Sequence, residues 1–422
     1  MSKTQVINMG CRLNAFESEA IRGLAQIAGL HDTIIFNTCA VTAEAERQAR
    51  QLIRREKRRN PGKRIIVVGC GAQLNPKEFS SMPEVDYVLG NDEKLRLEIW
   101  RGLERSRSVQ VSDIMNQTEI LNPVIKKFKK RARAFVQVQQ GCDHRCTFCI
   151  IPFSRGMNRS LPVELLVEQA DGLTRNGHQE IVLTGVDLCS YGKDTKNQVR
   201  LGGMLRILLD SVPRIKRLRL SSLDPASIDA GIFDLLENEP RLMPHIHLSI
   251  QSLDDMILKR MKRRHTVRGV WKVIEKIRDA RPGIAIGADL IAGFPTETSK
   301  MFKNTITTLV EMDIPFLHVF PFSERPGTPA AKMPKTPIEE RKERAAMLRH
   351  VGEGSKDKFL QNQFGCVVPV LVERGCFGRT EHSVLIKINN EVPAGKIVDV
   401  LVTGANGSRL EGKSMDGCRR IS

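Results

Sequence analysis

The sequence is poor in aromatic residues and in long apolar runs, and each shortage excludes a class of protein. Aromatic residues make up 5% of the 422 residues, so extensive base stacking is not the expected mode of nucleic-acid recognition. No stretch approaches the ~20 consecutive apolar residues that cross a membrane as a helix. The first residues, MSKTQVI, enter a strand-like run and lack the apolar core of a secretory signal. We therefore expect a cytoplasmic protein with no membrane segment.

Acidic residues are also in short supply. The chain has 66 Lys and Arg residues against 48 Asp and Glu residues, which gives a formal net charge of +18. A protein this basic usually binds a polyanion. Basic runs occupy residues 54–59, 126–133 and 259–265, and the middle run includes one aromatic residue, Phe128. Together they favour binding to a phosphate backbone, with an affinity that falls steeply with salt.

Ten cysteines in a chain without a secretory signal are expected to be reduced, which favours metal or redox chemistry over disulfides. Cys11, Cys39 and Cys70 each follow an apolar, strand-like run in a β-α-β-α-β pattern. That pattern predicts a parallel α/β sheet, and the carboxyl ends of its strands share one edge. Three separately buried thiols are the alternative, but the shared position of the three cysteines favours a common metal site.

Strand-like runs alternate with helical segments through the middle of the chain. This pattern predicts a partial (β/α)6 barrel, in which chemistry is expected at the carboxyl ends of the strands. The sequences that follow the runs are polar, glycine-bearing or both, as a binding face requires. The six predicted strands cover residues 135–139, 180–184, 217–221, 246–250, 284–291 and 316–320.

The first of these strands leads into a compact loop with Cys142, Cys146 and Cys149. A loop this short can wrap around an iron–sulfur cluster, but it offers three ligands where an ordinary structural cluster takes four. An incomplete set leaves one iron open to a substrate or cofactor. The alternative is a closed zinc site with His144 or Cys189 as its fourth ligand.

After about residue 364, alternating apolar residues punctuated by glycines predict a small β-barrel, a scaffold often used on RNA. We interpret Cys189, Cys366, Cys376 and Cys418 as structural, because none has ligand spacing. The expected domains are an amino-terminal α/β domain (1–115), a basic linker (116–133), the partial barrel (134–360) and the small β domain (361–422).

The Cys142-x3-Cys146-x2-Cys149 spacing, with Phe148 before the last cysteine, resembles the signature of radical S-adenosylmethionine (SAM) enzymes. Cys11, Cys39 and Cys70 resemble the amino-terminal domain of the methylthiotransferases in that superfamily, and the carboxy-terminal region resembles a TRAM domain. The motif around Gly10–Asn14 (Gly-Cys-Arg-Leu-Asn) is similar to the MtaB-like subgroup rather than to the isopentenyladenosine-modifying one, where Gln-Met-Asn is usual.

The resemblance implies two 4Fe–4S clusters, one on each cysteine trio, with SAM chelated by the open iron of the Cys142–Cys149 loop. Reductive cleavage would give methionine and a 5′-deoxyadenosyl radical, and the other open iron would present the sulfur that is transferred. The implied contacts to SAM lie in the loop and at the ends of the barrel strands. They are Phe148, Gly185, Val186, Ser222, Gln251 and Asp289.

The implied function is a tRNA methylthiotransferase that acts on C2 of N6-threonylcarbamoyladenosine at position 37, in the anticodon loop. It would require a low-potential electron donor and a sulfur donor. One alternative is a methylthiotransferase for N6-isopentenyladenosine in tRNA or for a ribosomal-protein aspartate, although a basic ribosomal protein suits a +18 enzyme poorly. Another is a non-catalytic, zinc-containing RNA-binding protein, which would be colourless rather than brown.

Overall fold

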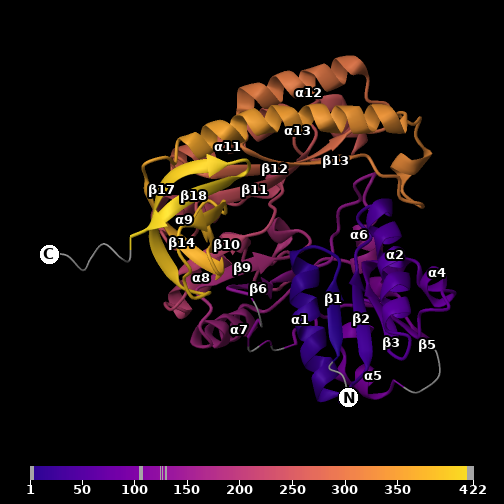
Figure 1. Cartoon of the computed structure of the whole chain (residues 1–422). Coiled ribbons are helices and arrows are strands. Elements are labelled where there is room, and N and C mark those ends of the chain that lie inside the picture. Colours follow the sequence, from indigo (N-terminus) through magenta and orange to yellow (C-terminus); the bar gives the residue numbers. More distant parts are fainter. Residues whose placement is uncertain (1–3, 104–107, 124, 126, 129–130, 416–422) are drawn as a thin grey trace.

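The computed structural model describes residues 4–103, 108–123, 125, 127–128 and 131–415, and Figure 1 shows their three-part arrangement. An amino-terminal α/β domain lies beside a partial barrel, and a small β-barrel covers the far end of the partial barrel. Cys418 and three lysines of the basic linker, Lys126, Lys129 and Lys130, lie outside the described residues. Among the described helices, none is long and apolar enough to cross a membrane.

The amino-terminal domain is a five-stranded parallel sheet with the strands in chain order. Both faces are covered: Ile34 and Phe36 pack toward α2, whereas Ile35 packs with Ile21 of α1. Burial on both faces explains why the strands are continuous apolar runs. The sheet contains β1 (Gln5–Asn8), β2 (Thr33–Thr38), β3 (Arg64–Gly69), β4 (Tyr87–Leu89) and β5 (Ser108–Gln110), with helices α1 (Arg12–Ile27), α2 (Ala43–Arg59), α3 (Cys70–Leu74), α4 (Pro76–Ser80), η1 (Glu93–Leu95) and α5 (Leu97–Arg101).

The central region contains the six predicted parallel strands in two sheets of three. Isolated bridges from Leu218 to Leu242 and from Leu223 to Leu248 join the two sheets into one curved wall. The predicted strand positions are confirmed to within two residues. The strands are β6 (Arg133–Gln137), β9 (Glu180–Thr184), β10 (Arg217–Leu220), β11 (His245–Gln251), β12 (Ala285–Ala292) and β13 (Phe316–Pro321).

Helices cover the outer face of this wall and bury one continuous apolar core against it. The helices are α7 (Val163–Arg175), α8 (Leu201–Ser211), α9 (Ala230–Asn238), α10 (Asp255–Arg260), α11 (Val267–Ala280), α12 (Ser299–Met312) and α13 (Ile338–Gln361). Shorter elements are η2 (Ile114–Asn116), β7 (Gln139–Gln140), α6 (Ile151–Arg155), β8 (Arg159–Ser160), η3 (Leu188–Ser190), η4 (Pro225–Ser227) and η5 (Pro329–Lys332).

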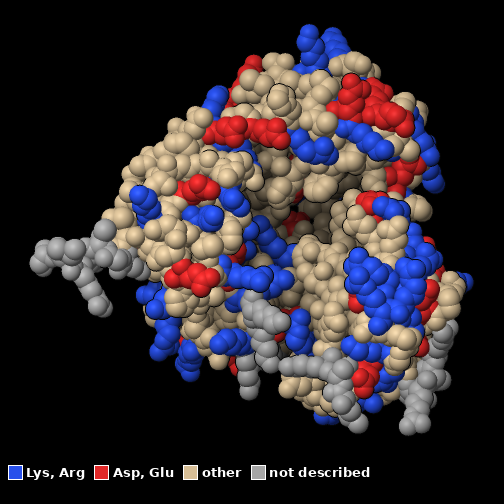
Figure 2. All heavy atoms as spheres, viewed as in Figure 1, with Lys and Arg blue, Asp and Glu red and all other residues tan. Residues whose placement is uncertain are grey.

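The wall does not close into a full barrel. Among the residues that the structure describes, no strand pairing joins β13 to β6. Helix α1 packs against β6, so the amino-terminal domain stands at the open side. Figure 2 shows a central hollow between this domain and the barrel. The carboxyl ends of both sheets therefore face a shared space.

The small carboxy-terminal domain is a closed five-stranded barrel, as predicted, and follows the long helix α13. It docks on the amino ends of the partial barrel's strands: Arg217 Nη2 donates to the Pro369 carbonyl at 2.7 Å, and Arg219 Nη1 to the Glu381 carbonyl at 2.9 Å. Its strands are β14 (Val367–Arg374), β15 (Phe377–Thr380), β16 (Leu385–Ile388), β17 (Ile397–Asn406) and β18 (Arg409–Ser414).

Two of the predicted basic runs are partly used inside the protein. In the linker, Phe128 is 1% exposed and belongs to the main core, so this aromatic ring cannot stack on a base. In the 259–265 run, Arg263 and Arg264 both donate to the carboxylate of Asp224, at 3.1 and 2.6 Å. The 54–59 run, by contrast, lies on the exposed face of α2.

Candidate active site

The amino-terminal cysteines come together at the carboxyl edge of the first sheet. Cys39 directly follows β2, Cys70 directly follows β3, and Cys11 precedes the first residue of α1. Gly69 allows the sharp turn into Cys70: its φ is +97°, and a Cβ there would lie 2.6 Å from the Thr38 carbonyl oxygen. The parallel strand order therefore brings the three cysteines to one edge of the sheet, as expected.

Burial dominates the electrostatics of this trio. It raises the pKa of Cys39 to about 12, with a further increase from the neighbouring sulfurs of Cys70 and Cys11. Thiolates gathered at one sheet edge bind a cation, and such soft donors favour iron–sulfur clusters or zinc. The chemistry of the donor set fits an iron–sulfur site with three protein ligands.

The second trio lies in one loop directly after β6 and β7. Gly141 precedes it with a φ of +72°, and a Cβ there would lie 1.8 Å from the Met157 carbonyl oxygen. Burial raises the pKa of Cys142 to about 12 and that of Cys149 to about 11. Arg263 Nη1 donates to Cys146 Sγ at 3.7 Å, so a cation from the segment between α10 and α11 faces this trio.

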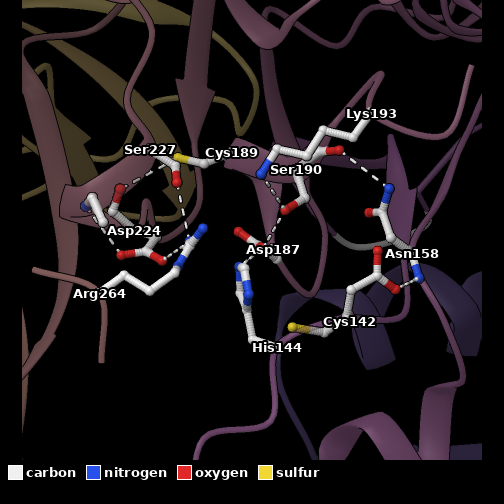
Figure 3. A network of polar contacts seen from close by, with 12 residues as sticks. Cys142, His144, Asn158, Asp187, Cys189, Ser190, Lys193, Asp224, Ser227 and Arg264 are labelled. Atoms are coloured by element: carbon white, nitrogen blue, oxygen red, sulfur yellow. Dashed lines mark hydrogen bonds and ion pairs between the residues drawn. The ribbon is translucent and has the colours of Figure 1, made fainter. Parts of the chain in front are cut away.

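Cys189 and His144, the two residues considered as a fourth zinc ligand, lie in different positions relative to the trio (Figure 3). Cys189 is buried and its Sγ donates to the Asp224 carbonyl at 3.7 Å, so it turns away from the trio. The imidazole of His144 lies near Cys142, but its Nε2 is 3.0 Å from an oxygen of Asp187. Cys189 is therefore not placed to complete a zinc site with the trio. His144 instead groups with Cys142 and Asp187, whose ligand atoms lie within 4.8 Å of one another.

Three of the predicted SAM contacts line one cavity of about 250 Å³. Phe148, Gln251 and Asp289 enter it from the barrel, whereas Val41 and Thr42 enter it from the loop after Cys39. The cavity therefore touches segments adjacent to both trios. The other predicted contacts follow neighbouring strands and do not line it. They are Gly185 and Val186 after β9 and Ser222 after β10.

A polar group on three adjacent barrel strands was not anticipated from the sequence. His247 Nε2 lies 2.9 Å from Asp289 Oδ1, and His318 Nδ1 lies 3.4 Å from the same oxygen. The three residues come from adjacent strands β11, β12 and β13. Their positions at matched register, His247 opposite Gly287 and Asp289 opposite His318, are the signal that a strand alignment could have used.

Arg12, the residue after Cys11, also reaches the barrel. Among the described residues it has no hydrogen bond or ion pair, although α1 is packed on β6. Burial, followed by the positive charges of Arg133, Arg219 and Arg379, lowers the pKa of Arg12 to about 10. The nearby carboxylate of Glu180 is already paired with Arg219 at 3.0 Å. Arg12 is thus a buried guanidinium with no partner of opposite charge among the described residues.

Comparison with family models supports this anatomy. Residues 136–309 match the model described as the Radical SAM superfamily, and residues 3–90 match the one described as Uncharacterized protein family UPF0004. The solved structure of the radical SAM methyltransferase TsrM from Kitasatospora setae, with tryptophan and a SAM analogue bound, is similar in fold. Its TM-score is 0.53 at 15% identity, over 78% of this chain and 74% of that one. The fold and the site define a radical SAM enzyme with a second cysteine trio.

Curated relatives narrow the class. The chain is 46% identical over 402 residues to the threonylcarbamoyladenosine tRNA methylthiotransferase MtaB of Rickettsia prowazekii, covering 95% of both proteins. It is 35% identical to the MtaB of Aquifex aeolicus, over 93% of this chain and 98% of that protein. A tRNA-2-methylthio-N(6)-dimethylallyladenosine synthase of Thermodesulfovibrio yellowstonii is 32% identical over 96% of both.

The chain belongs to the MtaB family of radical SAM methylthiotransferases. It is therefore an enzyme that uses SAM and carries two 4Fe–4S clusters. This finding confirms the resemblance drawn from the cysteine motifs and disfavours the zinc-containing, non-catalytic alternative.

Proposed function

We propose that this protein adds a methylthio group to C2 of N6-threonylcarbamoyladenosine at position 37 of tRNA. The observation that carries the proposal is the placement of the two cysteine trios around one space. The cavity lined by Phe148, Gln251 and Asp289 also contacts Val41 and Thr42, just after Cys39. A nucleoside between the trios would meet both the radical source and the sulfur source.

Each trio has a separate proposed role. Cys142, Cys146 and Cys149 would hold the cluster that binds SAM, and Cys11, Cys39 and Cys70 would hold the second cluster. When bound, these groups supply a 5′-deoxyadenosyl radical and the methylated sulfur. The protein's own contribution is to enclose the nucleoside, exclude water and keep its C2 atom near both sites. Phe148, which meets Phe294 edge to face at 6.5 Å, would provide an apolar wall.

The remaining proposed SAM contacts are Gly185, Val186, Ser222 and Gln251, at the carboxyl ends of β9 to β11, and Asp289, within β12. Their support is positional, because ligands bind at this end of β/α barrels. Gln251 adds a local signal: its φ of +74° is rare for a residue with a side chain and is found mostly where a site requires it.

The choice of threonylcarbamoyladenosine is supported by the relatives and by Arg12. The threonylcarbamoyl group ends in a carboxylate, whereas the isopentenyl group is apolar. The Arg12 guanidinium, which follows Cys11 and lies near Arg133, Arg219 and Arg379, suits a carboxylate partner. An apolar isopentenyl group would leave this charge without a partner. We infer that Arg12 contacts the threonyl carboxylate.

The exposed face of α2 supplies a surface for the tRNA backbone. Arg54, Arg55 and Arg58 line an open groove of about 590 Å³ together with Met9, close to the Cys11 turn. Figure 2 shows a blue patch over α2 beside the central hollow. Arg54 and Arg58 have no ion pair or hydrogen bond to a described residue, so both are free to bind phosphate.

A low-potential electron donor and a separate sulfur donor complete the proposed reaction. The electron must reach the cluster in the Cys142–Cys149 loop, and each turnover removes one sulfur from the protein. We place the protein in the cytoplasm, where thiols stay reduced; the nine cysteines that the structure describes form no disulfide.

The decisive experiment is mass spectrometry of tRNA nucleosides from cells that lack the protein. Loss of the 2-methylthio form of threonylcarbamoyladenosine, with the isopentenyl derivative intact, is the expected result. Loss of only the isopentenyl derivative's methylthio group would contradict the proposed substrate while leaving the enzyme class in place.

A further inference from the structure

One buried arginine links the two cysteine trios. Arg155 is the last residue of α6, six residues after Cys149, yet its guanidinium crosses into the amino-terminal domain. Its Nε donates to Cys70 Sγ at 3.2 Å. Its Nη1 donates to Glu17 Oε1 at 2.7 Å, and its Nη2 to Asn14 Oδ1 at 2.9 Å. With 2% of its surface exposed, the side chain is fixed in the interface.

Arg155 shares its carboxylate partner, Glu17, with a second buried basic residue. Glu17 also accepts from Lys94 Nζ at 2.6 Å, and both of these residues are fully buried. The positive charges of Arg155 and Lys94 lower the pKa of Glu17 to about 2, although burial alone would raise it. Arg155 and Lys94 therefore share one buried carboxylate, while burial lowers the pKa of Lys94. Within this dry interface the remaining donor of Arg155, its Nε, points at the Cys70 sulfur.

We propose that Arg155 is a positioning residue of the amino-terminal cluster, which raises that cluster's reduction potential through its hydrogen bond and charge at Cys70. Hydrogen bonds to cluster sulfurs and the local charge are the protein's main means of setting such potentials. Because Arg155 belongs to the same short segment as the SAM loop, it also fixes the distance between the two trios. This inference depends on the presence of the cluster and not on which nucleoside is modified.

Arg263 provides the matched comparison. It donates to Cys146 Sγ at 3.7 Å, in the other trio, and its charge is shared with Asp224. We therefore expect Arg263→Gln to act on the SAM-binding cluster and Arg155→Gln on the amino-terminal one. Arg175, exposed on α7 and paired with Asp171, serves as the control for loss of one arginine elsewhere.

The test is a redox titration followed by electron paramagnetic resonance on the full chain. Replacing Cys142, Cys146 and Cys149 by Ala leaves the amino-terminal cluster alone, so its potential can be read without overlap. In that background Arg155→Gln should shift the midpoint to a more negative value. Arg155→Lys keeps the charge but loses the planar fork, so its shift should be smaller. Arg175→Gln should leave the midpoint unchanged.

Two results would overturn the proposal. One is an unchanged midpoint in Arg155→Gln with full cluster content. The other applies if Arg155→Gln fails to assemble the cluster: Arg155→Met, which also lacks the charge and the hydrogen bond, then decides, and a wild-type midpoint there means that Arg155 only holds the interface together. Because the readout is a potential rather than methylthiolation, it is independent of the proposed substrate.

Discussion

The two cysteine trios are brought together in different ways. Cys142, Cys146 and Cys149 belong to one loop, so local backbone turns bring them together. Cys11, Cys39 and Cys70 follow three different strands, and only the parallel register of β1, β2 and β3 joins them. The comparison teaches that the loop site depends on local structure, whereas the amino-terminal site depends on the tertiary fold.

The largest expected effect is a separation of the two half-reactions. Cys146→Ala should abolish SAM cleavage while the amino-terminal cluster keeps its absorbance. Cys39→Ala should leave SAM cleavage in place but abolish methylthiolation, because the sulfur-bearing site is lost. Measuring 5′-deoxyadenosine and methylthiolated nucleoside in parallel checks both. SAM cleavage that survives in Cys146→Ala would contradict the assigned roles.

The dependence of the amino-terminal site on tertiary contacts can be tested at Glu17. Glu17→Gln leaves Arg155 and Lys94 buried without their carboxylate, which should lower the free energy of unfolding by about 3–5 kcal/mol. Thermal unfolding of the cluster-free chain measures this loss. Glu44→Gln, which breaks an exposed pair with Arg47, should leave the unfolding midpoint unchanged. Equal midpoints in the two variants would contradict a fold-dependent site.

Substrate choice gives an intermediate effect. Arg12→Gln removes a charged hydrogen bond to the proposed carboxylate, worth about 1.5–3 kcal/mol, so kcat/KM should fall by roughly tenfold to a hundredfold. Steady-state assays with threonylcarbamoyl-modified tRNA check this. Arg22→Gln, on the same helix but paired with Glu19, is the matched control. An equal loss in both variants would argue against a specific role for Arg12.

The smallest effect concerns the phosphate backbone. Replacing Arg54 and Arg58 by Gln should weaken tRNA binding by roughly threefold to tenfold and reduce the salt slope by about two. Binding titrations at several salt concentrations measure both quantities. Arg268→Gln with Lys272→Gln, exposed on α11, removes the same charge from another surface and should leave the slope unchanged.

Much of this anatomy could be predicted from the sequence, because it depends on local spacing. The loop trio, the strands and the small barrel all follow from residue patterns within short windows. The contacts between elements could not be predicted in this way. Arg155 and Glu17 are 138 residues apart, and no pattern in either segment indicates that their side chains meet. The sequence likewise places Phe128 in a basic linker, but tertiary packing buries its ring.

The pairing of His247, Asp289 and His318 was missed for a related reason. Each residue belongs to a different strand, and only strand register brings the three together. The basic run at 259–265 was predicted to bind phosphate, but Arg263 and Arg264 are paired with Asp224. This carboxylate lies about 40 residues earlier in the chain, so the run itself does not reveal the pairing. Charge density in a sequence does not reveal which charges are already paired.

The central claim is that both trios hold a cluster at the same time in one chain. Iron and sulfide analysis of anaerobically reconstituted protein tests it most directly, with the two triple-alanine variants measured beside the wild type. The account predicts about eight iron and eight sulfide per wild-type chain and about four of each in either variant. About four in the wild type, or zinc in place of iron, would contradict it.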